Sequence, residues 1–222
     1  MKKTLLIAAA ALAAGMISAQ AQAVYSQNVV GYVNVVFPAG YTMVNVPLNT
    51  DGTNNAETVL KTLQTGDTLL TWNGGGYDIS TYLDVGSWID ANGNPIAAPT
   101  LMPGKGFFYQ NAQGTPQTNT FVGQVTSSNT IPLLAGYNMI GLTAPVGASI
   151  ESTNISLPFQ TGDTILTWNG GGYDISTYLD VGTWIDANGN PISIPNLSVG
   201  QGFFYQNAQG ATESWTQNVK IQ

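Results

Sequence analysis

The 222-residue sequence contains no cysteine, no histidine and no arginine. Without cysteine there is no disulfide framework, no thiol nucleophile and no N-terminal cysteine for a lipid anchor. Without histidine and arginine, the common catalytic triads, the usual zinc sites and arginine phosphate clamps are excluded too. An enzyme built from this chain would depend on carboxylate or lysine chemistry. We therefore expect a protein that is not an enzyme.

Positive charge is scarce as well. The sequence has five lysines against twelve acids, and its formal net charge is −7. With no basic patch, the chain lacks the means to bind nucleic acid through its phosphates, and an anionic membrane surface would repel it. Charged residues make up 8% of the sequence, about a third of the usual share. The surface must therefore consist mainly of Thr, Ser, Asn, Gln and Gly, which suits exported proteins that are adhesive or face sugars.

The N-terminal residues have the pattern of a signal peptide. Lys2 and Lys3 precede an apolar run from Leu5 to Ala14, which is too short to span a membrane. Small residues follow, and we expect cleavage after Ala23. No later stretch reaches about 18 apolar residues, so we expect no membrane insertion after cleavage. The sequence thus predicts export to the periplasm, the cell surface or the extracellular space.

The sequence contains a long internal duplication with an offset of 96 residues. Residues 64–96 and 160–192 are identical at 31 of 33 positions. The segment GKGFFYQNAQG at 104–114 returns at 200–210 with one change. Residues 120–125 resemble residues 214–219 if two residues are deleted. This middle strand, at residues 121–125, could close the first unit or open the second. A repeat of this length is a small domain, so we predict a signal peptide (1–23) and two domains (24–126 and 127–222).

The hydrophobic period is two nearly everywhere, which indicates strands. The glycine run at 74–76 and the Asn-Gly pair at 92–93 indicate hairpin turns. One helix is predicted, over residues 56–63, with Asn54 or Asn55 as its cap. The fold class is therefore all-β, as two tandem sandwich-like domains of six or seven strands each, with a short helix in the first. A single pseudo-symmetric double sheet is the alternative.

Aromatic residues recur in each unit, and exposed coplanar rings are how proteins stack on sugars. Tyr82 shares a strand face with Asp78 and Ser80, so it could be exposed, whereas the tryptophans could equally form an ordinary core. The candidate ligand-binding residues are Trp72, Tyr77, Tyr82, Trp88, Trp168, Tyr173, Tyr178 and Trp184.

Oxygen-bearing side chains around residues 84–94 and 180–190 loosely resemble a calcium loop. The glycine stands at the wrong place for that loop and no downstream glutamate follows, so a hairpin turn is the favoured interpretation. No cofactor is expected, unless calcium binds. The residues that would then hold it are Asp84, Asp90, Asn92, Asn94, Asp180, Asp186, Asn188 and Asn190.

The motifs resemble an uncharacterised family of secreted bacterial two-repeat β proteins. These are the NVVGYVNV start at 28–35, the AGY hairpin at 39–41, the tryptophan-to-tyrosine turn at 72–77, and the PGxGFF element at 103–108. The second unit departs from the pattern at Val199, where the first has Pro103. The resemblance implies export and a β fold but no activity.

These observations lead to two hypotheses of function. The first is an exported, non-catalytic protein with a structural or adhesive role at the cell surface or in the extracellular matrix. The alternative is a carbohydrate-binding module with one aromatic site per repeat. The partners would be a polysaccharide or, through pairing of the first and last strands, a second copy of the chain.

Overall fold

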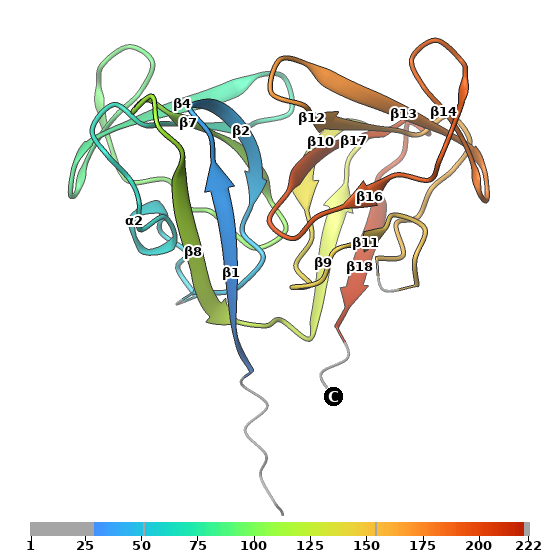
Figure 1. The fold of residues 1–222 in the computed structure, drawn as a ribbon, viewed down its shortest axis with the longest axis horizontal. Coiled ribbons are helices and arrows are strands. Elements are labelled where there is room, and N and C mark those ends of the chain that lie inside the picture. Colours follow the sequence, from blue (N-terminus) through green and yellow to red (C-terminus); the bar gives the residue numbers. More distant parts are fainter. Residues whose placement is uncertain (1–28, 51, 154, 220–222) are drawn as a thin grey trace, which may run out of the picture.

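The computed structural model describes residues 29–50, 52–153 and 155–219. The predicted signal peptide (1–23) lies outside these ranges. Within them the chain is mostly β-structure, arranged as two similar halves side by side (Figure 1). In this part of the chain no helix is long and apolar enough to span a membrane. The all-β fold and the internal duplication predicted from the sequence are confirmed.

Each half contains a six-stranded antiparallel sheet. The strand order is β2-β7-β3-β4-β5-β6 in the first half, hereafter repeat 1, and β10-β17-β12-β13-β14-β15 in repeat 2. The glycine loop turns the chain back as predicted, with Trp72 opposite Tyr77 and Trp168 opposite Tyr173. The strands of repeat 1 are β2 (Gly40–Asn45), β3 (Thr68–Trp72), β4 (Tyr77–Asp84), β5 (Ser87–Ile89), β6 (Pro95–Ile96) and β7 (Gly106–Asn111); those of repeat 2 are β10 (Gly136–Gly141), β12 (Thr164–Trp168), β13 (Tyr173–Asp180), β14 (Thr183–Ile185), β15 (Pro191–Ile192) and β17 (Gly202–Asn207).

A two-stranded sheet lies beneath each six-stranded sheet (Figure 1). In repeat 1, β1 (Val30–Phe37) pairs with β8 (Gln117–Gln124), and in repeat 2, β9 (Ser128–Leu133) pairs with β18 (Glu213–Asn218). The segment at 120–125 therefore closes repeat 1. Repeat 2 also has the short pair β11 (Ala148–Ser149) and β16 (Asn196–Leu197). With eight strands in repeat 1 and ten in repeat 2, the described chain has more strands than the six or seven predicted for each unit.

The repeat register also holds in the end strands. Phe37 pairs with Gln117, and Leu133 pairs with Glu213, so both members of the pair are offset by 96 residues. The predicted two-residue deletion before residues 214–219 is therefore wrong. It matched residues by chemical similarity, whereas the ladder with β9 makes Trp215 the equivalent of Asn119.

The helix is shorter than predicted. Helix α2 covers Ala56–Val59, with Asn55 as its cap, and Asn55 Oδ1 accepts a hydrogen bond of 2.9 Å from the Glu57 amide. The helix ends at Leu60, which is extended, because the next amide, that of Lys61, instead donates to Asn119 Oδ1 at 2.8 Å. Repeat 2 has β11 and turns in this place.

A hydrophobic core fills the space between the two sheets of each repeat, which gives the sandwich-like unit predicted from the sequence. Phe37, Leu48, Trp88 and Phe107 are among its fully buried residues in repeat 1. The prediction that Tyr82 could be exposed is wrong, because Tyr82 is only 8% exposed and packs against Trp88 with ring centroids 5.1 Å apart. The Asp78–Ser80–Tyr82 face of β4 is thus the inner one, although its residues are the more polar.

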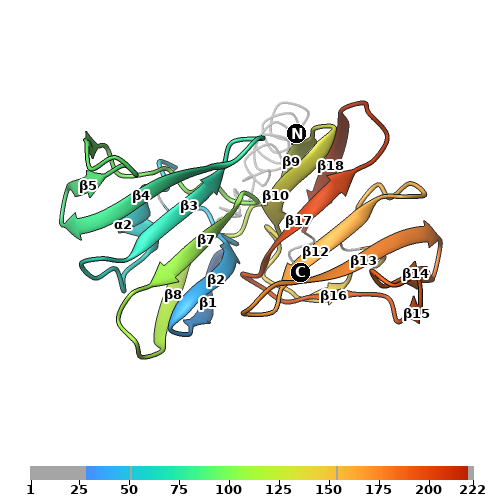
Figure 2. The same cartoon turned by 90° about the horizontal axis from the view of Figure 1, so that it is seen from above.

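The two repeats meet through their β2–β7 and β10–β17 edges around an approximate two-fold axis, which runs close to the viewing direction of Figure 2. The Asn45 amide donates to Gly200 O at 2.9 Å, and the Gly141 amide donates to Gly104 O at 3.1 Å. A separate hydrophobic cluster forms across this contact, from Met43, Phe108, Met139 and Phe204.

One pair of equivalent residues breaks this symmetry. Asn45 is fully buried, and its Nδ2 donates to Leu142 O at 2.7 Å. The residue 96 positions later is Gly141, where a Cβ atom would lie only 2.2 Å from Asn45 Cγ. Because the two positions face each other across the axis, only one of them has room for a side chain.

Candidate functional site

Half of the repeated aromatic residues lie at the contact between the repeats. The Trp72 indole nitrogen donates to Tyr137 O at 2.9 Å, and that of Trp168 donates to Tyr41 O at 3.0 Å. The hydroxyls of Tyr77 and Tyr173 lie 3.4 Å apart near the axis. These four rings are half-buried and contact Phe108 and Phe204 edge-on rather than forming a flat exposed platform.

Burial at this contact also affects ionisation. Burial, and then the hydrogen bond to Tyr173, raise the pKa of Tyr77 far above its ordinary value. The Tyr77 hydroxyl therefore stays neutral at physiological pH, and its contact with Tyr173 links the two repeats at the axis.

The other four aromatic candidates belong to the cores. Trp88 and Trp184 are each 1% exposed, and Tyr82 and Tyr178 pack against them. The Trp88 indole donates to Glu57 Oε1 at 2.7 Å, as the Trp184 indole does to Glu151 at 2.6 Å. Protein covers these rings, so in this structure they have no face on which a sugar could stack.

The oxygen-bearing candidates for calcium are spread over two loops in each repeat. Asp84 ends β4 and caps its own turn by accepting from the Val85 amide at 2.8 Å. Asp90 follows β5, about 13 Å away along the ladder. Among the described residues no three Asp, Glu, His or Cys side chains gather closely enough to hold a metal ion.

Asp90 organises its own hairpin. Its Oδ1 accepts from the Asn92 and Asn94 amides at 2.8 Å, and its Oδ2 accepts from Asn94 Nδ2 at 3.0 Å. These bonds, the Asn94 side chain first, hold the pKa of Asp90 below its usual value. Asp186 has the same contacts with Asn188 and Asn190. The geometry favours the hairpin interpretation over the calcium one.

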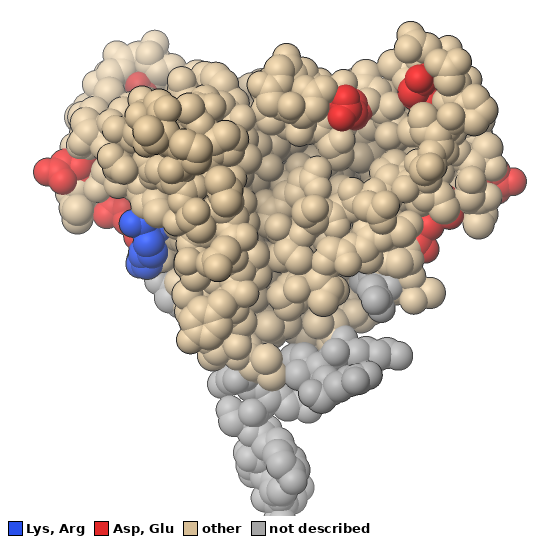
Figure 3. Space-filling view, viewed as in Figure 1, with Lys and Arg blue, Asp and Glu red and all other residues tan. Residues whose placement is uncertain are grey.

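The outer surface of each six-stranded sheet carries the same side chains, and in repeat 1 it forms a broad, shallow hollow. This outer face is lined in repeat 1 by hydroxyl, amide and aliphatic side chains, and the only charged residue on it is Asp90. On the side of the molecule that Figure 3 shows, the acidic side chains are scattered and most of the surface carries no charge. The outer face of repeat 1 consists of Tyr41, Thr68, Leu70, Ile79, Thr81, Ile89 and Gln110, and that of repeat 2 of Tyr137, Thr164, Leu166, Ile175, Thr177, Ile185 and Gln206.

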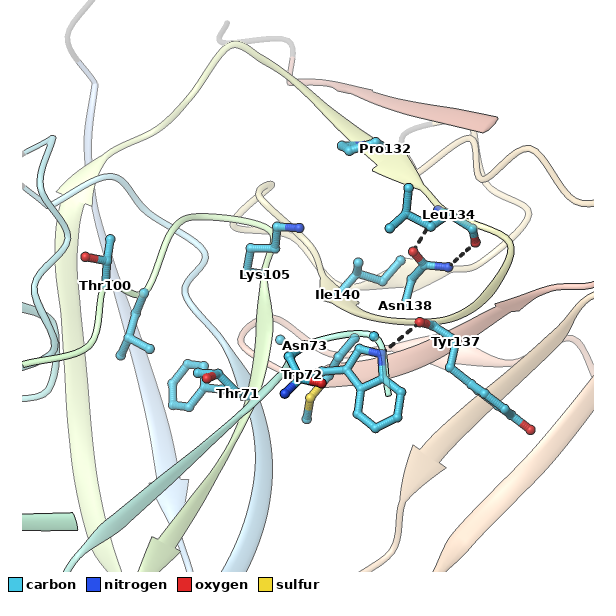
Figure 4. A pocket seen from close by; sticks show the side chains of 15 residues that line it. Thr71, Trp72, Asn73, Thr100, Lys105, Pro132, Leu134, Tyr137, Asn138 and Ile140 are labelled. Atoms are coloured by element: carbon cyan, nitrogen blue, oxygen red, sulfur yellow. Dashed lines mark hydrogen bonds between the residues drawn. The ribbon is translucent and has the colours of Figure 1, made fainter. Parts of the chain in front are cut away.

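A narrower cleft of about 350 Å³ lies between the repeats, next to Trp72. One wall comes from repeat 1, from Thr71 to the glycine loop and from Thr100 to Phe107. The other comes from the hairpin between β9 and β10, with Leu134 and Tyr137. Lys105 extends its ammonium group across the space between the walls (Figure 4).

The approximate symmetry creates a twin of this cleft on the opposite side of the molecule. The twin is somewhat smaller, about 280 Å³, and is lined by Val35, Thr42, Trp168 and the turn at 198–201. At the place of Lys105 it has Gln201, whose Oε1 accepts from the Ser198 amide at 2.9 Å. The two clefts thus share part of their lining, including the equivalent tryptophans, but differ in size and in charge.

Sequence reasoning missed Lys105 because a single lysine in a loop has no periodic or motif signal. It also missed the buried carboxylates Asp67 and Asp163. Tyr109 donates to Asp67, and the Ala112 amide does so at 3.0 Å; Tyr205 and Ala208 repeat the arrangement around Asp163. The only available signal was that the Gly-Asp-Thr and Phe-Phe-Tyr segments both recur. Full burial and several donors make these carboxylates anchors of the sheet.

Comparison with protein-family models, with curated proteins and with solved structures found no match to this chain. The two similar arrangements of sheets show an internal repeat. The chain's own surfaces are therefore the guide to its function.

Proposed function

We propose that the chain is an exported, non-catalytic β-repeat protein that serves adhesion or structure at the cell surface or in the extracellular matrix, and that its two outer faces hold a neutral polysaccharide. The observation that carries this proposal is a contrast between the six-stranded sheets and the layer beneath them. All seven outer-face residues of repeat 1 recur unchanged in repeat 2, as do core residues on the inner side of the sheet such as Trp88 and Phe107. The lower part of the core differs, for example at Phe37 and Leu133, or at Leu48 and Ala144.

Packing alone does not require this contrast. Apart from Tyr77, which meets Tyr173 at the axis, the residues of β4 and β5 and of the loops that follow them lie away from the contact between the repeats, yet they are copied almost without change. Two equal surfaces on one rigid body would bind a repeating polymer far more tightly than one surface. The resemblance to secreted bacterial β-repeat proteins supports export and is consistent with this role.

The chemistry of the outer face suits an uncharged, hydroxyl-rich ligand. Thr68 and Thr81 form a hydroxyl pair at 3.2 Å on adjacent strands, and Ile79 is 36% exposed beside them. Hydroxyls that both donate and accept can bond sugar hydroxyls, while aliphatic side chains cover the sugar's apolar face. The alternative module, with one aromatic site per repeat, has less support, because its rings are buried in the cores or turned toward each other across the axis.

Calorimetry and retention on insoluble neutral polysaccharides test this proposal. We expect two equal sites per chain, and we expect Ile79→Asn and Ile175→Asn each to remove one of them. The matched controls are Val85→Asn and Val181→Asn, at turn residues that are 80% and 79% exposed but lie off the outer face. Failure of the chain to bind any neutral polysaccharide, or equal loss in the control variants, would contradict the proposal.

Self-association is a second candidate, and one observation favours it. Val30, Tyr32 and Val36 point outward from β1 and are 53%, 74% and 57% exposed. The equivalents of the last two in β9 are Ser128 and Pro132. Proline and polar residues protect an edge strand from pairing, so β9 is protected and β1 is not.

Under this second candidate, β1 would pair with β1 of another copy. Light scattering at rising concentration should then show association that the double variant Tyr32→Ser/Val36→Pro abolishes. A molecular mass that does not change with concentration would exclude it.

A further inference from the structure

We infer that the cleft beside Lys105 binds the carboxylate of an acidic saccharide, a hexuronic acid unit, and that its symmetry-related twin does not. The cleft shares only Tyr137 with the outer face of repeat 2, and the proposed binding does not depend on the function of the outer faces. The duplication relates the cleft to its twin, but the two differ in charge.

Lys105 gives the cleft a positive charge. No acidic residue lines the cleft, and within the described ranges the Lys105 ammonium has neither an ion pair nor a hydrogen bond. The rest of the described surface has an excess of acids, so an anion is repelled elsewhere and attracted here. An unpaired ammonium at a concave site attracts a carboxylate more strongly than one on an open surface, because the low-dielectric walls focus its field.

The second step concerns the groups around the ammonium. Thr71 and Thr100 line the same cleft, and their hydroxyls have no hydrogen-bond partner in the described part of the chain. Trp72 lies at the base of the cleft, oriented by its bond to Tyr137 O (Figure 4). Free hydroxyls beside an indole ring match a sugar, which presents hydroxyls at its rim and C–H groups on its face. A peptide carboxylate would leave the threonines unused.

The third step is the twin, which acts as an internal control. At the place of Lys105 it has Gln201, whose side-chain oxygen is already bonded to the Ser198 amide of its own turn. Its indole, Trp168, has the same kind of bond as Trp72. The twin thus retains the ring but lacks a free charged group, its lining includes no counterpart of Thr71 or Thr100, and its volume is smaller.

The test is calorimetry of the full chain with trigalacturonate, and with its neutral counterpart, a trisaccharide of galactose. We expect one trigalacturonate per chain. Lys105→Gln copies the twin's residue and should weaken binding about tenfold or more, which corresponds to about 1.4 kcal/mol or more. Gln201→Lys should add a second, weaker site. Higher salt should weaken binding to the parent but not the residual binding of Lys105→Gln.

Three results would overturn the inference: unchanged affinity in Lys105→Gln, equal affinity for the neutral trisaccharide, or equal binding of a tripeptide whose only charge is its terminal carboxylate. Lys105 is exposed, so the variant should fold, and an unchanged unfolding transition would verify this. Ile79→Asn serves to separate the two sites. It should leave trigalacturonate binding intact even if it abolishes binding at the outer face.

Discussion

The two repeats are almost the same in their six-stranded sheets and unlike in the layer beneath. In β8 the inward residues are Asn119 and Phe121, whereas in β18 they are Trp215 and Gln217, so the polar and the aromatic residue have changed places. Helix α2 has no counterpart among the residues of repeat 2 that the structure describes. The sheets meet each other across the axis and present the outer faces, which constrains both copies together. The lower layer has only to fill the core of its own repeat, and different sets of side chains can do this.

The largest expected effect on the free energy of unfolding comes from the lower layer, where Trp215 in repeat 2 and Asn119 in repeat 1 occupy equivalent positions. Trp215 is fully buried and donates to Ile155 O at 2.6 Å, while Asn119 donates to the equivalent oxygen, that of Val59, at 3.2 Å. Trp215→Ala should lower the free energy of unfolding by about 3–5 kcal/mol, because it empties the volume of an indole. Asn119→Ala should cost about 1–3 kcal/mol, for the unpaired buried groups it leaves.

Urea unfolding followed by circular dichroism measures both losses. An Asn119→Ala variant that lost as much unfolding free energy as Trp215→Ala would contradict this prediction. It would mean that the buried asparagine stabilises repeat 1 as much as the buried tryptophan stabilises repeat 2.

The next effect tests the asymmetric pair at the axis. Gly141→Asn should lower the free energy of unfolding by about 1–3 kcal/mol, because two side chains would then compete for one space. Asn45→Gly should cost about 1 kcal/mol, through the lost hydrogen bond to Leu142 O. The double variant moves the side chain to the other repeat, and we expect it to regain most of the loss.

A double-mutant cycle in urea gives the coupling energy of this pair. Additive losses would mean that the two residues do not compete for space. Gly136→Ala is not a suitable control, since that glycine has a φ of 83° and strain would be added. Tyr41→Phe, at a partly exposed residue near the axis, serves instead.

A smaller effect should be equal in the two repeats. Glu57 and Glu151 accept the indole hydrogen of Trp88 and Trp184, although they are 94 rather than 96 residues apart. Glu57→Gln and Glu151→Gln should each cost about 1 kcal/mol, since a charge-assisted hydrogen bond becomes a neutral one. Tryptophan fluorescence during urea unfolding measures both. Unequal losses would show that the sheet layer, too, differs between the repeats.

The smallest effect depends on pH. Burial, and then the charge of Asp163, raise the pKa of Glu213 above its ordinary value, and the equivalent residue in repeat 1 is Gln117. A raised carboxyl pKa means that the folded state disfavours the charged form, so a penalty exists at neutral pH and disappears below the ordinary pKa. Glu213→Gln should therefore raise the midpoint of thermal unfolding slightly at pH 7 and leave it unchanged near pH 3. A rise at pH 3 as well would contradict this assignment.

Much of the fold could be read from local patterns. The turns at Asn73–Gly76 and Asn92–Gly93 and the strands beside them follow from backbone preferences of single residues, and the structure has them as predicted. The inner face of β4 could not be read in this way. Alternation separates two faces but does not say which is covered, and Tyr82 is covered because Trp88 stands opposite it.

The sites were harder to predict than the strands. Trp72 and Tyr77 lie where they do because a second copy of the sheet packs against them, and no local pattern contains that contact. Lys105 lines a cleft only because the other repeat supplies the opposite wall. The duplication itself predicted two equal units. How they pack against each other depends on Gly141 and Asn45, a difference too small to stand out in a sequence.

The pairing of the first and last strands also determines how the molecule would respond to force. Val30 pairs with Gln124 and Ser128 with Asn218, so β1 begins and β18 ends beside the short linker that joins the repeats, at the side away from the outer faces (Figure 1). Tension applied at the start of β1 or the end of β18 would unzip the β1–β8 or β9–β18 ladder. The hydrogen-bonded residue pairs would then break one after another, instead of all being sheared at once. The two-stranded sheets of the lower layer would unfold first and release extra chain length. Both six-stranded sheets would keep their shape, and their outer faces would still point away from the end of the molecule at which the force acts.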